Sequence, residues 1–226
     1  MQAIHATPPA APAPQKSIEW PAELVEGTEE TWRAFAKRRG LSPLTISIAV
    51  RSGLLRFCRI EGIACYVVTD AARRCAEIRR CDGQWFTPEH KPYWLKGVDK
   101  SWLPGCELLR DEPRDTGVLL VEGCTDLLSA LGLYIIYRHS GGTASWRPLG
   151  LFGATCTRLA PDATALIRGR RVRLVTDGDA AGDKMRAHWT ALLREIGCTV
   201  DAVTLPRQTD LTDHHTTISP QLLFSL

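Results

Sequence analysis

Apolar runs and helical stretches alternate through the second half of the chain, and this alternation constrains the fold more than any other feature. Four strand-like apolar runs lie within residues 118–122, 149–154, 171–177 and 199–206. Helical periodicity is seen between them, within residues 125–138, 161–168 and 181–196. Strands that alternate with helices are typical of a parallel, doubly wound sheet. We therefore expect an α/β fold with a mostly parallel sheet over residues 116–226.

The segment before residue 116 has a different pattern and predicts a smaller α+β unit. Residues 28–55 contain two short helices, the first ended by Gly40 and the second begun by Ser42 and Pro43. Short strands are expected within residues 57–60, 63–70 and 75–80, with a turn at Asp82 and Gly83.

The acidic, proline-containing sequence "LLRDEPRDTG" separates these two patterns and predicts a domain boundary near residue 115. Residues 1–16 are rich in Ala and Pro and predict an extended, disordered tether. The expected organisation is a tether over 1–16, a basic α+β subdomain over 17–115 and the doubly wound domain over 116–226.

Positive charge is concentrated in the first half of the chain. Residues 31–100 hold 14 Lys and Arg against 6 Asp and Glu, whereas the whole 226-residue chain has a net charge of only +3. Such a field attracts phosphate backbones, although a solvated Arg-rich face gives the same count. The lysines of "HKPYWLKGVDKSW" alternate with aromatic residues that either stack on bases or belong to the core. The candidate nucleic-acid-binding residues are Arg79, Arg80, Lys91, Trp94, Lys96 and Lys100.

Other features of the composition exclude some classes of protein. None of the eight cysteines forms a CxxC pair, so we expect no structural zinc site and mostly buried, reduced thiols. No apolar run reaches the length of about 18 residues that a membrane helix needs, and the first residues lack the order of a signal peptide. We expect a cytoplasmic protein that does not contact membranes.

Carboxylates follow the strand-like runs. Glu122 ends the first run, Asp177 and Asp179 follow the third, and Asp210 and Asp213 follow the fourth. The carboxyl ends of parallel strands meet at one edge of a sheet, where ligands bind. Clustered carboxylates repel one another unless a cation lies among them, and Mg²⁺ or Mn²⁺ fits oxygen ligands of this kind. The pattern predicts a metal site suited to phosphoryl-transfer chemistry.

Asp126, in the first turn of the helix that follows Glu122, is a further candidate ligand. Asp126 could instead be a helix N-terminal charge, and Asp210 or Asp213 could cap a turn in the tail. Small residues support the metal site, because Gly123 and Gly178 adjoin the acids and permit tight turns.

Four short motifs resemble a known family. "VEGCTD" resembles the glutamate motif of the Toprim domain, and "TDGDAAG" resembles its DxD motif as found in bacterial and phage primases of the DnaG type. "GLFGATCTRL" is similar to the glycine turn between these motifs, and "TLPRQTDLTDHH" to the paired aspartates of a phage-primase ending. The resemblance covers about residues 116–217, and the upstream basic segment is loosely similar to the N-terminal part of a primase catalytic core.

The resemblance implies a site with assigned roles. Glu122, Asp177 and Asp179 would be catalytic, with Asp126, Asp210 and Asp213 completing the acidic metal site and glycines forming the turns around it. Those glycines are Gly123, Gly153, Gly178 and Gly182.

The implied function is a primase-like nucleotidyltransferase that makes short RNA primers from ribonucleoside triphosphates on single-stranded DNA, with Mg²⁺. The alternatives are a Toprim nuclease and a non-catalytic nucleic-acid-binding accessory protein. The sequence contains neither a Cys/His zinc-binding module nor a GxxxxGK[ST] loop. Template recognition and DNA unwinding would therefore come from partners, namely a separate zinc-binding protein and a helicase. A catalytic core from a phage or mobile element fits this interpretation.

Overall fold

The computed structural model describes residues 19–20, 23–88, 92, 95–153 and 155–225. The tether predicted over residues 1–16 lies outside the described part. Within that part, no helix has both the length and the apolar character needed to cross a membrane. Seven of the eight cysteines are buried, as expected, and Cys81 is partly exposed.

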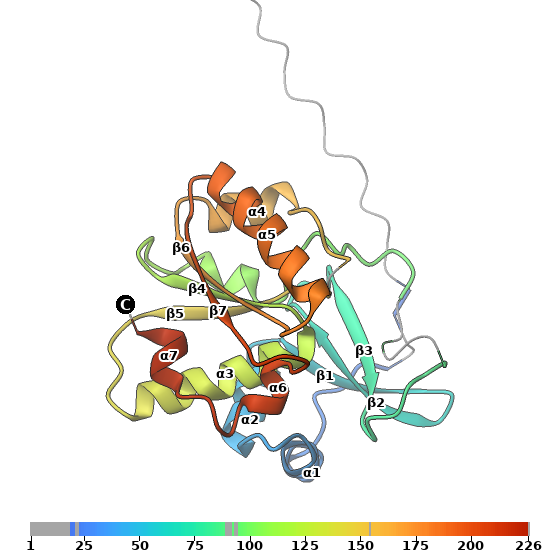
Figure 1. Cartoon of the computed structure of the whole chain (residues 1–226). Coiled ribbons are helices and arrows are strands. Elements are labelled where there is room, and N and C mark those ends of the chain that lie inside the picture. Colours follow the sequence, from blue (N-terminus) through green and yellow to red (C-terminus); the bar gives the residue numbers. More distant parts are fainter. Residues whose placement is uncertain (1–18, 21–22, 89–91, 93–94, 154, 226) are drawn as a thin grey trace, which may run out of the picture.

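The first half of the chain forms two helices and an antiparallel sheet, in agreement with the sequence pattern (Figure 1). The sheet has the strand order β1-β2-β3. The elements are α1 (Glu29–Arg39), α2 (Pro43–Arg51), β1 (Leu55–Ile60), β2 (Ile63–Thr69), β3 (Ala76–Arg80) and the 3-10 helix η1 (Cys106–Leu109).

The helix ends have the expected chemistry. Gly40 ends α1 in the left-handed conformation, with φ 67°, and the Ser42 side chain caps α2 by accepting a hydrogen bond from the Thr45 N–H. Because Gly40 turns the chain sharply, α1 and α2 pack against each other, and the end of α1 is held in a defined position.

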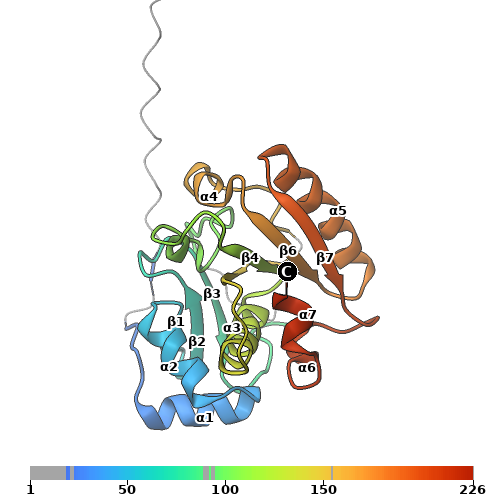
Figure 2. The same ribbon diagram turned by 90° about the vertical axis from the view of Figure 1, so that its left-hand side faces the viewer.

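The second half of the chain is the expected doubly wound domain. Its four strands are all parallel, in the order β5-β4-β6-β7. Figures 1 and 2 show α3 and α5 on opposite faces of this sheet. The elements are β4 (Gly117–Val121), α3 (Cys124–His139), β5 (Trp146–Gly150), α4 (Pro161–Ile167), β6 (Arg171–Thr176), α5 (Ala180–Glu195), β7 (Thr199–Thr204), α6 (Leu211–His214) and α7 (Pro220–Phe224).

One strand begins earlier than expected. The sequence predicts the second strand within residues 149–154, but β5 starts at Trp146 and ends at Gly150. The reason is packing across the sheet. Trp146 pairs with Gly117, and a Cβ atom on Gly117 would lie 2.6 Å from the indole ring. The missing side chain on β4 therefore makes room for a tryptophan in the neighbouring strand.

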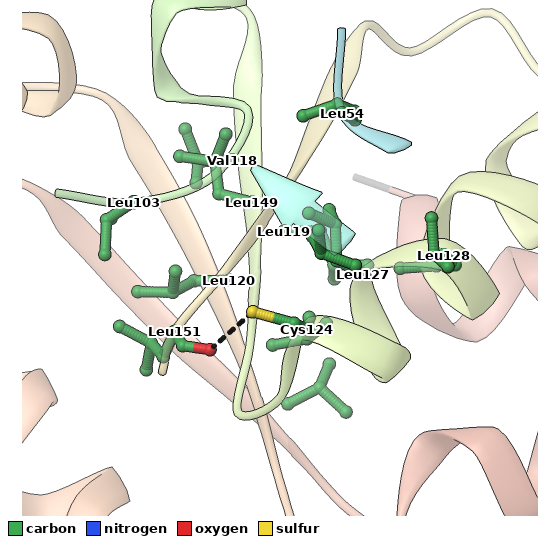
Figure 3. Close-up of a cluster of buried hydrophobic side chains, with 14 of the residues drawn as sticks. Leu54, Leu103, Val118, Leu119, Leu120, Cys124, Leu127, Leu128, Leu149 and Leu151 are labelled. Carbon is green, nitrogen blue, oxygen red and sulfur yellow. Dashed lines mark hydrogen bonds between the residues drawn. The ribbon is translucent and has the colours of Figure 1, made fainter. Parts of the chain in front are cut away.

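The hydrophobic core crosses the predicted boundary at residue 115. Leu54 and Leu103, from the first half, belong to the same buried cluster as Leu119 and Leu149 of the parallel sheet (Figure 3). In the same view the Cys124 thiol donates a hydrogen bond to the Leu151 carbonyl oxygen, at 3.7 Å. The boundary thus lies between the two sheets, but one hydrophobic core includes residues from both sides of it. This shared core fixes the position of one half relative to the other.

Candidate active site

A cavity of about 380 Å³ lies at the carboxyl edge of the parallel sheet and faces the end of α1 and the end of β3. One side, which we call the acidic wall, consists of Glu122, Asp126, Asp177, Asp210 and Asp213. The lining also includes three arginines, which we call the basic wall: Arg39, Arg79 and Arg80. Gly83, Gln84, Gly123, Thr125, Gly153 and Thr212 complete the lining.

A larger cavity, of about 600 Å³, lies beside the β1–β2 hairpin and is lined by Cys58, Cys65 and Cys81, among others. Burial raises the pKa of Cys58 to about 12 and also raises the pKa of Cys65. These thiols stay protonated and unreactive at neutral pH. The smaller cavity, with opposed charges, is therefore the candidate active site.

Two acids meet because their strands are neighbours. Glu122 directly follows β4 and Asp177 directly follows β6, and these strands pair in parallel with Val121 opposite Val175. A Glu122 carboxylate oxygen accepts a hydrogen bond from the Asp177 backbone N–H at 3.0 Å. The expectation that parallel strand ends bring these acids together is met in the structure.

Asp126 links the sheet to the C-terminal acids. Its Oδ1 accepts hydrogen bonds from the Thr212 N–H, at 3.0 Å, and from the Thr212 hydroxyl, at 2.8 Å. These bonds hold α6 against the first turn of α3. Asp210 caps α6 by accepting from the Asp213 N–H at 2.8 Å, so it has both the capping role and a place in the acidic wall.

Asp179 lies close enough to Glu122 and Asp177 for its charge to raise their pKa values, but its side chain has another partner. Its Oδ1 accepts a hydrogen bond from the Gly182 N–H at 2.8 Å, which makes it the N-cap of α5. It does not line the cavity. Asp179 is thus a helix cap, a role that the sequence pattern did not predict, and its part in metal binding remains a prediction.

Burial and the charges of neighbouring carboxylates raise the pKa of three acids of the cavity, Glu122, Asp126 and Asp177. Desolvation, followed by the charges of Glu122, Asp126, Asp210 and Asp179, raises the pKa of Asp177 to about 8. Desolvation and then the charge of Asp210 raise the pKa of Asp126 to about 7, even though Thr212 opposes the shift. Desolvation also raises the pKa of Glu122. Without a cation, this wall therefore retains protons near neutral pH.

The acids fit a divalent cation that is bound in part by other ligands. Among the described residues, no group of three or more His, Cys, Asp and Glu side chains could hold a metal ion unaided. Mg²⁺ commonly takes only one or two carboxylates and completes its shell with water and substrate phosphates. A cation would also offset the repulsion that raises the pKa of Asp177 and Asp126.

Arg39 is a site residue that the sequence reasoning missed. It is the last residue of α1, and its Nη2 donates a hydrogen bond to the Tyr66 hydroxyl at 2.9 Å. That hydroxyl lies 3.3 Å from the Thr125 Oγ1 on the opposite side of the cavity. The buried Nε of Arg39 has no hydrogen-bond partner among the described residues. The run of three basic residues before Gly40 was a signal, but only the fold shows that the third one faces the acids.

Arg79 and Arg80 were predicted to bind nucleic acid, and both line the cavity. Arg79 is paired with the buried Glu77 at 2.5 Å, and Arg80 is paired with Asp82. Each arginine is therefore held in place by a carboxylate of its own hairpin, and the basic wall is fixed before any ligand arrives.

The remaining candidates for nucleic-acid binding lie elsewhere. Lys91 and Trp94 are outside the described residues. Lys96 is 84% exposed and forms an ion pair with Glu19 at 3.6 Å, and Lys100 lines a separate cavity of about 330 Å³ with Arg158. Trp102, an aromatic residue of the same segment, is buried, with only 2% of its surface exposed. For Trp102 the assignment to the core is confirmed.

The four predicted glycines divide into two pairs. Gly123 and Gly153 line the cavity. Gly178 and Gly182 instead allow backbone to pass close by: a Cβ on Gly178 would lie 1.8 Å from the Pro206 carbonyl oxygen, and one on Gly182 would lie 2.1 Å from that of Asp177. Gly178 therefore allows the loop after β6 to lie against the loop after β7, and Gly182 allows the first turn of α5 to lie against the start of the loop after β6.

Comparison with known proteins agrees with this geometry. Residues 119–215 match the family described as Toprim-like, and these residues include the whole acidic wall. The chain therefore contains a Toprim-like domain. No curated protein sequence matches the chain.

The solved structures that resemble the whole fold are primase catalytic cores. The primase fragment of the bacteriophage T7 primase-helicase protein matches with a TM-score of 0.53 and 16% identity, over 80% of this chain and 68% of that one. The DnaG catalytic core matches with a TM-score of 0.51 and 19% identity, over 82% and 67%. The RNA polymerase domain of Mycobacterium tuberculosis primase DnaG matches with a TM-score of 0.53 and 15% identity, over 87% and 75%.

These matches cover both halves of the chain, so the α+β half and the Toprim-like half together have the architecture of a primase core. The recognition drawn from the motifs and the expected fold class are confirmed. At these identities the likeness concerns the fold, and the chemistry has to be argued from the site.

Proposed function

We propose that the protein is a primase-like nucleotidyltransferase that joins ribonucleotides on single-stranded DNA with Mg²⁺ or Mn²⁺. The observation that carries this proposal is the cavity in which the acidic wall faces Arg39, Arg79 and Arg80. A nucleoside triphosphate needs both kinds of group, because its phosphates bind cations of the protein and also a metal ion. A binding module for a polyanion would gain nothing from the acidic wall.

Glu122, Asp177 and Asp126 are the residues that would hold the metal ion, with Asp210 and Asp213 next to them. A divalent cation at this place supplies positive charge that offsets the charge developing on phosphate oxygens. Asp179 could join these ligands only by giving up its hydrogen bond to the Gly182 N–H. We therefore propose that the negative charge of Asp179 acts mainly on Asp177, whose pKa it helps to raise.

Glu122 has the properties of an acid/base group. In a transfer of this class, the 3′ hydroxyl of one nucleotide attacks the phosphate of the next, and pyrophosphate leaves. One Glu122 oxygen is fixed by the Asp177 N–H, which orients the carboxyl group. Its raised pKa brings the group closer to neutrality, where proton transfer is efficient.

The basic wall would bind phosphates. Arginine offers a planar set of donors that matches phosphate oxygens, and partners within the protein already orient these three side chains. Because these partners already order the three arginine side chains, less side-chain entropy is lost when a nucleotide binds.

The comparisons suggest how such a core is used in a larger assembly. The T7 relative is a fragment of a primase-helicase protein. The Aquifex aeolicus primase structure, of which this chain spans 54%, contains zinc-binding and RNA polymerase domains. We infer that a helicase and a zinc-binding, template-recognising unit act together with this core, and that it serves DNA replication of a host, phage or mobile element.

A direct assay tests the proposal. The protein is incubated with single-stranded DNA, labelled ribonucleoside triphosphates and Mg²⁺ or Mn²⁺, and the products are separated by size. We expect short RNA oligomers that depend on both the DNA and the metal, and that disappear in Asp177→Asn. Cut DNA in place of oligomers would identify a Toprim nuclease. DNA binding without either product would identify an accessory protein.

A further inference from the structure

His215 connects the C-terminal segment with the end of α1. Its Nε2 lies 3.0 Å from the Gly40 carbonyl oxygen, and its Nδ1 lies 2.5 Å from the Thr212 carbonyl oxygen. Both partners are acceptors, so the ring donates: a neutral imidazole can serve one of the two oxygens, and an imidazolium serves both. In both views of the ribbon, α6 lies beside the end of α1 (Figures 1 and 2). We call this connection the His215 bridge, and it joins residues that are 175 positions apart in the sequence.

Gly40 leaves room for the His215 ring. A Cβ atom on Gly40 would lie 3.0 Å from the His215 Nε2 and 3.1 Å from its Cε1, which is closer than an ordinary contact. The left-handed conformation that ends α1 at this position also favours glycine, with φ 67°. Glycine therefore serves two purposes here, the end of the helix and the approach of the ring.

The His215 bridge reaches both walls of the candidate active site. Arg39 of the basic wall directly precedes Gly40. On the other side of the ring, Thr212 donates its N–H and its hydroxyl to Oδ1 of Asp126 in the acidic wall. The ring thus lies between a residue that binds an acid of the site and the residue next to an arginine of the site.

A second connection joins the same two walls. The Arg39 Nη2 donates to the Tyr66 hydroxyl, which is hydrogen-bonded to the Thr125 Oγ1 in the same turn of α3 as Asp126. Arg39 is therefore held from two directions, through its own side chain and through the backbone of Gly40. The two connections close a circuit of hydrogen bonds and backbone around one end of the cavity.

The fold has other contacts that hold the same elements together. α2 packs against α3, where a Cβ atom on Gly132 would lie 3.2 Å from the Thr45 Oγ1. One buried core includes residues of both halves. Because His215 itself is partly exposed, its removal should loosen the last turn of α1 and leave the rest of the fold intact.

We propose that His215 is a positioning residue, which acts through Gly40 to fix the place of the Arg39 guanidinium relative to Asp126. A ribonucleoside triphosphate with a bound divalent cation would contact arginines and acids at the same time, so its affinity depends on the spacing between them. This inference rests on the proposed function, because only a ligand that carries both phosphates and a metal ion needs both walls.

The test compares three substitutions of His215 with one of its neighbour. His215→Ala removes the ring, His215→Phe keeps a ring without N–H groups, and His215→Gln keeps an amide donor. His214→Ala is the matched control, because the ring nitrogens of His214 lie against the hydroxyls of Thr209 and Thr217 in its own segment. Thermal unfolding of each variant confirms that the fold is retained.

The first measurement is the affinity for ATP with Mg²⁺, by calorimetry without DNA. We expect His215→Ala and His215→Phe to weaken binding about three- to tenfold, the effect of losing one hydrogen bond that orders a ligand-binding group. In primer synthesis the same variants should raise KM and leave kcat nearly unchanged. His215→Gln should retain more affinity than His215→Phe, and His214→Ala should match the wild type. Wild-type affinity in His215→Ala or in His215→Phe would overturn the inference.

A double-mutant cycle shows whether His215 acts through Arg39. In the Arg39→Ala background, the further change His215→Ala should weaken ATP binding very little, because the guanidinium that the bridge positions is already gone. A full additional loss would show that His215 acts by another route, and the inference would be wrong.

Hydrogen exchange separates this inference from the proposed function, because it needs no nucleotide. In His215→Ala, backbone amides at the end of α1 should exchange faster than in the wild type, whereas His214→Ala should leave them unchanged. Unchanged exchange at the end of α1 in His215→Ala would refute the positioning role. A wild type that binds no ATP would refute the proposed function, and the exchange result would then decide about the His215 bridge. The expected loss of ATP affinity in a protein that makes no oligomers would refute the proposed function while supporting the role of His215.

Discussion

The acidic wall lies mainly at the carboxyl edge of the parallel sheet, whereas the basic wall lies at the end of helix α1 and at the end of strand β3. Glu122 and Asp177 follow neighbouring strands, so hydrogen bonding within the sheet fixes their spacing. Arg39, in contrast, reaches the cavity only because α1 ends at Gly40 and its guanidinium binds Tyr66. One wall is set by the regular fold and the other by individual side-chain contacts.

This difference has consequences for function. The acids sit on a rigid frame that holds like charges together against their repulsion, which is what a metal site needs. The arginines depend on carboxylates and a tyrosine that can be removed one at a time. Substitutions in the acidic wall should therefore abolish chemistry, whereas substitutions in the basic wall should weaken substrate binding.

The largest effect is expected for Asp177→Asn, which tests the acidic wall. The amide keeps the shape of the side chain but removes charge next to Glu122, so transition-state stabilisation of several kcal/mol is lost. RNA synthesis should fall by about a thousandfold or more, since each ~1.4 kcal/mol is a factor of ten. Asp162→Asn, on an exposed helix start, is the matched control. Wild-type turnover in Asp177→Asn would disprove the metal-site assignment.

A smaller effect is expected for Arg39→Ala, which tests the basic wall. A hydrogen bond to a charged group contributes about 1.5–3 kcal/mol, so substrate affinity should fall by roughly ten- to a hundredfold. The loss should be seen in KM more than in kcat. Tyr66→Phe removes only the hydroxyl that orients Arg39 and should show the same pattern, more weakly. A loss in kcat alone would move Arg39 from binding to catalysis.

The two walls also differ in how far the sequence predicted them. Parallel strands have a fixed geometry, so acids at strand ends were enough to predict that Glu122 and Asp177 meet. The helix-cap role of Asp179 was not predicted, and only the hydrogen bond from the Gly182 N–H to its Oδ1 shows it.

The basic wall required contacts between residues far apart in the chain, such as Arg39 with Tyr66, and no local pattern encodes these. The same limit explains the early start of β5, where Trp146 depends on the missing side chain of Gly117 across the sheet. It also explains the shared core, because sequence patterns give the faces of the elements but not which faces meet. The predicted division into two domains therefore stays a prediction, because the two halves share one core.

A pH effect sharpens the comparison, since the acidic wall should make the metal-free protein less stable in alkali. The pKa of Asp177, about 8, and that of Asp126, about 7, lie above their values in the unfolded chain. The folded state therefore binds these protons more tightly, so this stability is present at low pH and is lost as pH rises through about 7 to 8. Thermal unfolding in EDTA should show a decrease of several degrees between about pH 5 and pH 9, at roughly 2–4 °C per kcal/mol.

Two additions check the origin of that decrease. Asp177→Asn should flatten the dependence of the unfolding temperature on pH, because its side chain does not titrate. Mg²⁺ should restore stability at high pH, where the carboxylates are charged and available to it. If the wild type and Asp177→Asn show the same pH dependence, repulsion within the acidic wall is not the cause of the decrease.

The smallest effect is expected outside both walls, from the lysines of residues 91–100. Replacing Lys91, Lys96 and Lys100 together with alanine should weaken binding of single-stranded DNA modestly and flatten the slope of log affinity against log salt. For a single strand, the slope falls by about 0.7 for each phosphate that a lysine no longer neutralises, because fewer counterions are released. Lys96 is 84% exposed and forms an ion pair with the exposed Glu19 at 3.6 Å, so we expect the fold to tolerate its replacement. Anisotropy titrations over a range of salt measure the slope, with Lys184→Ala on α5 as the control. An unchanged slope would show that these three lysines do not neutralise DNA phosphates.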